Sequence, residues 1–354
     1  MDLIASDKIQ LREVKFMQKF EHGGQIYNAD GKAGDFLDFS ANINPLGVSE
    51  KVRAAILENL DGVKNYPDSN ATELKAAISQ RYKVATENLV LVNGAAEFFY
   101  LYLNVTRPQK ILIPVPSFSE YERAARAINA EVEYIFTRAE ENFELSLTQD
   151  FSADLMILGR PNNPTGNLIS LDALKKVSAV TNILVDESFI DFLEIESARK
   201  LVSEKISVVQ SLTKIFAIPG LRLGFAVVEK NLAAKLNAAK DVWNVNFLAQ
   251  KAGVATLSDE KYLSDTKNWL HTEQKFFVEQ LQKISGVEFF QPTVNFVLLK
   301  FETADAANLA VQKLLREKIL IRRCENFVGL DGRYLRCAIR SRAENLKLLE
   351  VLAN

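Results

Sequence analysis

Short apolar runs that recur through the first two thirds of the 354-residue chain constrain its fold more than any other feature. Each run ends at a turn or charged residue, and the runs lie at 89–92, 110–113, 130–136, 155–158, 183–185, 206–209 and 223–228. Continuous apolar runs of this length are typical of buried strands. Segments with helical spacing, such as 119–129 and 170–180, separate them. This alternation predicts an α/β fold with a mostly parallel central sheet flanked by helices, with 223–228 as the candidate antiparallel strand.

The C-terminal third has a different pattern. Strand-like segments and helix-like segments are grouped there, with strands expected at 287–301, 319–321 and 334–339 and helices at 303–317 and 343–352. This grouping predicts a smaller α+β domain, which the mostly helical stretch 230–283 joins to the first. We expect a large domain over residues 61–261. The small domain would combine residues 1–60, which include an N-terminal arm, with residues 262–354.

Composition excludes several classes of function. Lys and Arg total 43 against 45 Asp and Glu, a net charge of −2, so the chain lacks the basic excess of a nucleic-acid-binding protein. No apolar run approaches the roughly 18 residues that span a membrane, and the charged N-terminus is unlike a signal peptide. Two cysteines, Cys324 and Cys337, and two distant histidines predict no metal site. We therefore expect a cytoplasmic enzyme without nucleic-acid or membrane partners.

Polar residues follow most of the predicted strands at their carboxyl ends. They include Asn93-Gly94, Pro116-Ser117, Arg160 to Asn163, Asp186 and Ser211 to Lys214. In open α/β sheets, ligands bind beyond the carboxyl ends of the strands. Several of these segments together therefore predict one pocket.

Two of these segments could bind a ligand with a positively charged ring. Residues 162–166 read Asn-Asn-Pro-Thr-Gly, which by itself is more often simply a tight turn. Asp186 ends an apolar strand, where a buried carboxylate requires a cationic partner, and a protonated pyridine nitrogen would serve. A helix-capping role is the alternative for Asp186, and on this residue alone it is the more common one.

The sharpest segment is Ser-Leu-Thr-Lys at 211–214, followed by Pro219-Gly220 and Arg222. Hydroxyls and a guanidinium group can hold a phosphate, because arginine presents a fork of donors that matches its oxygens. A lysine beside them, partly desolvated and near positive charge, would have a lowered pKa and act as a nucleophilic amine. A lone lysine is more often a solvated surface group, but the ordered combination favours a site.

The ordered set of 162–166, Asp186, 211–214 and Arg222 resembles the fold-type-I pyridoxal-phosphate enzymes of the aminotransferase class. Within that class, further blocks are similar to the threonine-phosphate decarboxylases of cobalamin biosynthesis. These blocks are His-Gly-Gly at 22–24, DFSANINPLG at 38–47, Tyr-Pro-Asp at 66–68, SLTKIFAIPGLRLG at 211–224, Gly-Leu-Asp at 329–331 and RYLRCAIRS at 333–341. The similarity extends from about residue 22 to 345, nearly the whole chain.

The resemblance implies pyridoxal 5'-phosphate as cofactor and assigns a role to each matching residue. Catalysis would rest on Lys214, bonded to the cofactor aldehyde, and on Asp186, paired with the pyridinium nitrogen. The other cofactor contacts would be Asn163 to the phenolic oxygen, Phe118 on the ring face, and Ser211, Arg222 and the amides of Ala95 and Ala96 after Gly94 to the phosphate. Tyr66 would reach the phosphate of the neighbouring subunit, which implies a homodimer with shared active sites.

For the substrate, a small phosphorylated amino acid, the resemblance places His22, Gly23, Asn42, Asn163, Arg322 and Arg336 around it. Arg336 is the candidate for the carboxylate, and Arg322 with His22 for the phosphate ester. Without the His-Gly-Gly context, a turn histidine in the N-terminal arm is the preferred interpretation of His22. Arg322 and Arg323 could equally form a solvated strand edge.

The chain departs from the family pattern at a few positions. Ala95 and Ala96 stand where polar residues are frequent, so phosphate contacts there would be through the backbone. Arg160 stands where a small or hydroxyl residue is usual, and its charge near the pocket could alter substrate choice. Ser188 replaces a common alanine. Phe189 stands where many aminotransferases carry a tyrosine, and this departure fits a decarboxylase better than a transaminase.

The resemblance implies decarboxylation of L-threonine O-3-phosphate to (R)-1-aminopropan-2-yl phosphate and CO2. The first alternative is an aminotransferase on a phosphorylated substrate, similar to histidinol-phosphate aminotransferase. Ile43 argues mildly against it, because that family usually has an acidic residue there. A non-enzymatic protein that kept the fold is the second alternative. A hydrolase and a dinucleotide-binding protein are disfavoured because neither GxSxG nor an early GxGxxG is present.

Overall fold

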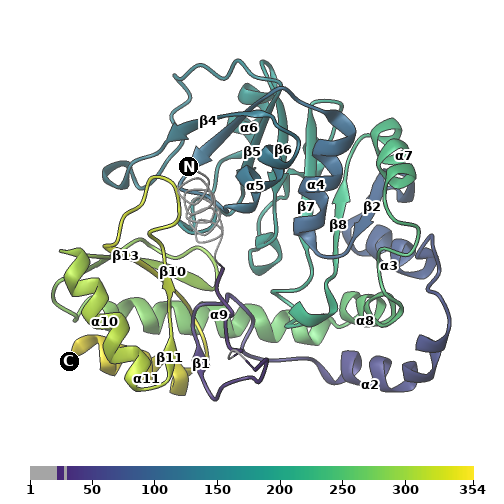
Figure 1. Ribbon diagram of the computed structural model, residues 1–354. Helices are drawn as coiled ribbons and strands as arrows, with labels where there is room; N and C mark the ends of the chain where they lie inside the picture. Colours follow the sequence, from purple (N-terminus) through teal and green to yellow (C-terminus); the bar gives the residue numbers. More distant parts are fainter. Residues whose placement is uncertain (1–21, 28–29) are drawn as a thin grey trace, which may run out of the picture.

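The computed structural model of the chain describes residues 22–27 and 30–354. A seven-stranded sheet forms the upper part of the molecule in Figure 1, in the order β2-β8-β7-β6-β5-β3-β4. Its strands are β2 (Leu89–Val92), β3 (Lys110–Val115), β4 (Glu131–Phe136), β5 (Leu155–Gly159), β6 (Asn182–Asp186), β7 (Ile206–Ser211) and β8 (Gly224–Val227). β3 to β7 pair in parallel, whereas β8 is antiparallel to both β2 and β7. The predicted α/β fold and the antiparallel strand are confirmed.

Apart from the edge strand β4, both faces of this sheet are buried, which explains why most of its strands are apolar runs. Ile111 and Ile113 of β3 pack on one face with α4 and α5, while Leu112 packs on the other with α6. The helices along the larger sheet are α4 (Ala95–Thr106), α5 (Glu120–Ala127), α6 (Leu171–Ser178) and α7 (Lys230–Ala239). Further helices are α2 (Glu50–Glu58), α3 (Thr72–Tyr82), α8 (Phe247–Leu257) and α9 (Glu260–Leu281).

A four-stranded antiparallel sheet lies in the C-terminal third, in the order β12-β13-β10-β9. It consists of β9 (Val287–Phe289), β10 (Phe296–Phe301), β12 (Arg322–Arg323) and β13 (Tyr334–Ala338), with α10 (Ala304–Arg316) and α11 (Arg342–Ala353) beside it. Pro292 lies in the break between β9 and β10, where we expected one interrupted strand. The short strands β1 (Leu37–Asp38) and β11 (Ile319–Leu320) pair in parallel. The two sheets lie in the two regions expected to form separate domains; the domain boundaries stay a prediction.

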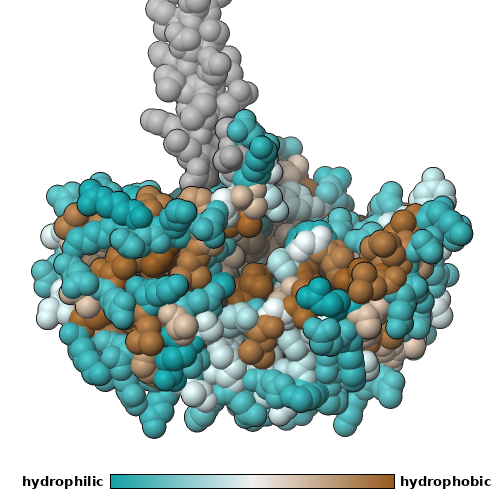
Figure 2. Space-filling model, turned by 90° about the horizontal axis from the view of Figure 1, so that it is seen from below, coloured by the Kyte–Doolittle hydropathy of each residue, from teal (hydrophilic) through white to brown (hydrophobic). Residues whose placement is uncertain are grey.

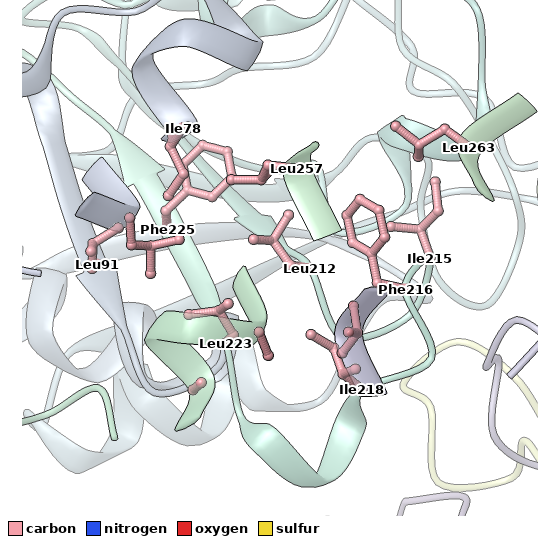
Figure 3. Packing of buried hydrophobic residues seen from close by; sticks show 14 of the residues in the cluster. Ile78, Leu91, Leu212, Ile215, Phe216, Ile218, Leu223, Phe225, Leu257 and Leu263 are labelled. Carbon is pink, nitrogen blue, oxygen red and sulfur yellow. The ribbon is translucent and has the colours of Figure 1, made fainter. Parts of the chain in front are cut away.

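The segment around Lys214 is anchored in the largest apolar cluster of the described chain. Leu212, Ile215 and Phe216 are at most 2% exposed, and they pack with residues of β2, β8 and α8 (Figure 3). Full burial of such a side chain contributes about 1.5–3 kcal/mol. These anchors on both sides therefore fix the backbone that carries Lys214.

The outer surface carries several apolar patches on the face seen from below in Figure 2. Exposed large apolar side chains include Leu57, Leu60 and Val63, in and just after α2. Within residues 22–27 and 30–354, no helix is both long and apolar enough to cross a membrane.

Candidate active site

The carboxyl ends of the parallel strands bring the predicted cofactor residues to one place. Asn163 follows β5, Asp186 ends β6, and Lys214 follows β7. One cavity is lined by eight of the predicted residues: Ala95, Ala96, Phe118, Asn163, Asp186, Ser211, Lys214 and Arg222. The prediction that strand ends form one pocket is confirmed.

Lys214 lies inside this cavity as a weakly solvated amine. Its Nζ is 3.2 Å from the Ser211 Oγ, to which it donates, and 5.8 Å from the centre of the Phe189 ring. The pKa of Lys214 is lowered to about 8, chiefly by burial; the Asp186 carboxylate opposes this shift and the Arg222 guanidinium adds to it. A substantial fraction of the amine is thus neutral near physiological pH, the form that attacks a carbonyl.

Asp186 is held rigidly at the end of β6. Its Oδ2 accepts a hydrogen bond from the Tyr121 hydroxyl at 2.8 Å, and its Oδ1 accepts from the Ser188 amide at 2.9 Å. Asp186 is 7% exposed and caps no helix, so the alternative reading does not hold. Burial and the carboxylate of Asp186 raise the pKa of Tyr121 well above its ordinary value, so Tyr121 stays a donor.

A candidate phosphate cradle lies at the N-terminus of α4. Gly94 has φ +82°, and a Cβ there would lie 2.3 Å from the Arg222 Nη2, so only glycine admits the guanidinium so close. Ala95 and Ala96 begin the 12-residue helix with free amides that favour an anion. The Ser211 and Thr213 hydroxyls are 2.7 Å apart at the same cavity. This donor set suits a phosphate group.

Arg336 approaches the cavity from β13 of the four-stranded sheet. Its Nη1 donates to the Asn163 Oδ1 and its Nη2 donates to the Ser40 carbonyl at 2.6 Å. The Arg336 Nε is buried without a hydrogen-bond partner. Burial lowers the pKa of Arg336 to about 10, and among the described residues no carboxylate forms an ion pair with it. Arg336 therefore carries a buried charge that is met only by neutral acceptors.

A second buried guanidinium faces the first. Arg322 of β12 lies opposite Arg336 of β13 in the antiparallel ladder, and the two residues are 7% and 5% exposed. Like charges directly opposite each other are destabilising. Asn42, whose Oδ1 is buried without a partner, belongs to the loop beside Ser40. The alternative of a solvated strand edge is therefore wrong for Arg322, and the pair is suited to anionic groups.

His22 and Gly23 reach the same region from the N-terminal side. The His22 Nε2 lies 2.8 Å from the Glu120 Oε1, and the ring lies 5.4 Å from the Phe118 ring. Gly23 packs so tightly that a Cβ there would lie 2.0 Å from the Ser40 carbonyl oxygen, the acceptor of Arg336. The structure thus brings both residues next to the cavity.

Comparison with known proteins agrees with this geometry. The family model for aminotransferase class I and II matches residues 34–352. The chain belongs to the class I and II aminotransferase family.

Relatives within this family carry two activities in their names. A threonine-phosphate decarboxylase from Salmonella typhimurium is 36% identical, over 94% of this chain and 96% of the relative. A crystal structure of L-threonine-O-3-phosphate decarboxylase from Porphyromonas gingivalis has a TM-score of 0.81 at 28% identity, covering 89% of this chain and 97% of that one. A histidinol-phosphate aminotransferase from Clostridium acetobutylicum has a TM-score of 0.83 at 35% identity, covering 89% and 98%.

Two residues that the sequence placed at or near the pocket, Tyr66 and Arg160, do not line the cavity. Tyr66 is 76% exposed and stacks on Trp243 with ring centres 4.1 Å apart, outside the lining of the cavity. Its expected contact with a neighbouring subunit stays a prediction. The structure corrects the expectation for Arg160, because its Nη1 pairs with the Glu187 Oε1 at 2.7 Å. The Arg160 charge is matched there and does not enter the pocket.

Sequence reasoning missed several residues of the site. Tyr121 and Glu120 hold Asp186 and His22, and Ser40 accepts from Arg336. Ser40 lies within the block 38–47 and was within reach of the family resemblance. Tyr121 and Glu120 follow Phe118 by only a few residues, but no spacing rule connects them to partners 65 and 98 residues away.

Proposed function

We propose that this chain is a pyridoxal-phosphate-dependent decarboxylase of L-threonine O-3-phosphate in cobalamin biosynthesis. The products would be (R)-1-aminopropan-2-yl phosphate and CO2. The facing pair Arg322 and Arg336 carries this proposal, because two buried guanidinium groups, of which Arg336 contacts the cavity residue Asn163, match a substrate with both a carboxylate and a phosphate. The name and the near-complete coverage of the Salmonella relative support it.

The residues present fit pyridoxal 5'-phosphate. Asp186 offers a carboxylate already oriented by Tyr121 to a ring nitrogen, and Arg222 with the start of α4 offers the phosphate cradle. The Asn163 Oδ1 accepts from Arg336, which leaves the Asn163 amide nitrogen to donate to the phenolic oxygen. Phe189 adds no hydroxyl there. Pyridoxal phosphate, when bound, supplies an electron-withdrawing ring that stabilises negative charge at the substrate α-carbon.

The side chains of the site would then determine which bond at the substrate α-carbon breaks. Arg336 binds the substrate carboxylate and fixes its orientation relative to the ring, while Arg322 and His22 hold the phosphate ester. Such positioning of a reacting group can lower the activation free energy by several kcal/mol. The bond between the α-carbon and the carboxylate breaks, and CO2 leaves. Lys214, with its pKa near 8, is suited to give a proton to the α-carbon.

Subunit contacts form part of the same proposal. Exposed apolar side chains cluster at 57–66 and 242–243, where Leu57, Leu60, Val63, Tyr66, Val242 and Trp243 are 44–76% exposed. Exposed apolar side chains in such number are typical of a protein interface. We expect a homodimer in which Tyr66 contacts the cofactor phosphate of the neighbouring subunit. Light scattering of the purified protein measures the number of subunits.

The alternative is an aminotransferase acting on a phosphorylated substrate. The 35% identity to the Clostridium acetobutylicum histidinol-phosphate aminotransferase favours it. It would share Lys214, Asp186 and the phosphate cradle, and would differ in the bond broken. A phosphorylated amine such as histidinol phosphate has no carboxylate, so it would leave Arg336 without its anion during the first half of the reaction.

The deciding experiment incubates the purified protein with pyridoxal phosphate and L-threonine O-3-phosphate, anaerobically and without a keto acid, and follows CO2. Catalytic CO2 release that disappears in Lys214→Ala supports the decarboxylase. No CO2, together with slow conversion to the pyridoxamine form, would instead assign an aminotransferase. A parallel incubation with histidinol phosphate and 2-oxoglutarate tests that activity on its own substrates.

A further inference from the structure

A buried carboxylate stands behind His22 at the edge of the candidate active site. Glu120 is the first residue of α5 and is 6% exposed. Its Oε1 lies 2.8 Å from the His22 Nε2, and its Oε2 accepts from the Tyr100 hydroxyl at 2.9 Å. The Arg123 Nη1 is 3.3 Å from the Oε1. Glu120 thus joins helices α4 and α5 to the N-terminal arm.

The contacts keep this carboxylate ionised. Burial opposes the charge, but hydrogen bonds from His22 and Tyr100 outweigh burial, so the pKa of Glu120 lies below its ordinary value. A carboxylate only accepts hydrogen bonds, and the proton in the contact with His22 therefore sits on Nε2. Nδ1 is then the ring nitrogen that remains for another partner, and it donates to an anion when the ring carries a proton on both nitrogens.

The residues after His22 bind the same loop that Arg336 contacts, at Ser40. The Gly24 amide donates to the Ser40 Oγ at 2.8 Å, and the Ser40 carbonyl accepts from Arg336. Gly23 packs against that carbonyl, and the His22 ring packs near Phe118, which lines the cavity. The orientation of His22 is therefore set at two points, by Ser40 through the backbone and by Glu120 through the side chain.

We propose that Glu120 is a positioning residue that orients His22 toward the phosphate of the substrate and thereby selects phosphorylated over unphosphorylated amino acids. This inference rests on the proposed function, because it takes the phosphorylated ligand to be the substrate. Glu120 itself would not touch the phosphate, since His22 lies between the two anions.

The test compares the affinities of L-threonine O-3-phosphate and L-threonine, read from the visible absorbance of the bound cofactor in wild type, Glu120→Gln, His22→Ala and the double variant. A neutral acceptor forms a weaker hydrogen bond than a carboxylate. Glu120→Gln should therefore lower the affinity for L-threonine O-3-phosphate about five- to tenfold. Affinity for L-threonine and for the cofactor should change less than about twofold by the same reasoning. In the His22→Ala background, Glu120→Gln should add nothing.

Glu122→Gln is the matched control. Glu122 is also buried on α5, and it pairs with Arg126 at 2.6 Å rather than with His22. Equal weakening of both ligands, the same loss in Glu122→Gln, or a loss that persists without His22 would each overturn the inference. Binding is measured apart from CO2 release, so a protein that binds selectively but releases no CO2 would refute the proposed function and leave the role of Glu120 standing.

Discussion

Two arginines of this chain are almost equally buried but lie in opposite electrostatic surroundings. Arg160 and Arg336 are 4% and 5% exposed. Arg160 meets the Glu187 carboxylate at 2.7 Å and the carbonyls of Ile169 and Glu196 at 2.9 and 3.0 Å. Arg336 meets one amide oxygen and one carbonyl, and its Nε has no partner.

The difference indicates what each charge is for. A buried ion pair with satisfied hydrogen bonds is complete without a ligand, so Arg160 belongs to the framework that carries the loops around the cavity. A buried cation that meets only neutral acceptors, opposite a second guanidinium, is favourable only when an anion enters. Under the proposed function, Arg336 is the residue that binds the ligand's carboxylate, and this anion would compensate the buried charge.

The largest expected effect comes from breaking the complete pair. Glu187→Gln would leave Arg160 buried without its carboxylate, which should lower the free energy of unfolding by about 3–5 kcal/mol. Denaturant unfolding measures this. Glu196→Gln is the control, because that exposed side chain pairs only with Lys200 and should change stability by less than about 0.5 kcal/mol. If Glu187→Gln is as stable as the control, the pair is not part of the framework.

Arg336→Met should have the opposite profile. Removing a buried, unmatched charge should leave the free energy of unfolding unchanged or slightly higher, whereas kcat/KM for L-threonine O-3-phosphate should fall about a hundredfold or more. Arg342→Met serves as the control, because Arg342 is matched by Glu273 at 3.0 Å and lies outside the cavity. A loss of stability in Arg336→Met comparable to that of Glu187→Gln would erase the distinction between the two arginines.

The fold could be predicted largely from sequence because its signals are local. Apart from the edge strand β4, the strands of the larger sheet are buried on both faces, so most of them are apolar runs bounded by turns. The exception at 223–228 was also visible, and β8 is antiparallel. The positions of Asp186 and Ser211 at strand ends follow from the same runs, because each residue is the last of its strand.

The electrostatic partners could not be predicted, because they are not local. Nothing near Arg160 in the sequence indicates Glu187, and nothing near Arg336 indicates that its nearest acceptors are Asn163 and Ser40. Those two contacts join residues 173 and 296 positions apart. A charged residue after a strand therefore predicts a site or an ion pair equally well until the fold places its neighbours. Arg160, expected near the pocket, is the clearest example.

The comparison can be sharpened with ligands that differ in one group. In the cofactor-free protein, L-threonine O-3-phosphate should raise the free energy of unfolding by about 2.7 kcal/mol at 100 times its Kd. O-phosphoethanolamine, which lacks the carboxylate, should bind more weakly to wild type. The two ligands should bind alike in Arg336→Met. A carboxylate preference that survives in this variant would place the carboxylate at another cation.

The last expected effect concerns Lys214, a cation that lines the cavity, and it depends on pH. Burial lowers the pKa of Lys214 from 10.5 to about 8, so below pH 8 the folded cofactor-free protein bears the full cost of a desolvated ammonium group. Between these values the unfolded chain binds more protons than the folded chain, and the contribution of Lys214 to stability therefore rises with pH.

Lys214→Met should accordingly be more stable than wild type below pH 8, and the difference should shrink as the pH approaches 10.5. Unfolding of both proteins across this range measures the gap, with the exposed Lys205→Met as control, since solvent reaches that ammonium group in either state. A gap that stays constant with pH would mean that Lys214 is solvated in the free protein. Arg336 would then differ from Lys214, because its charge is desolvated in the free protein.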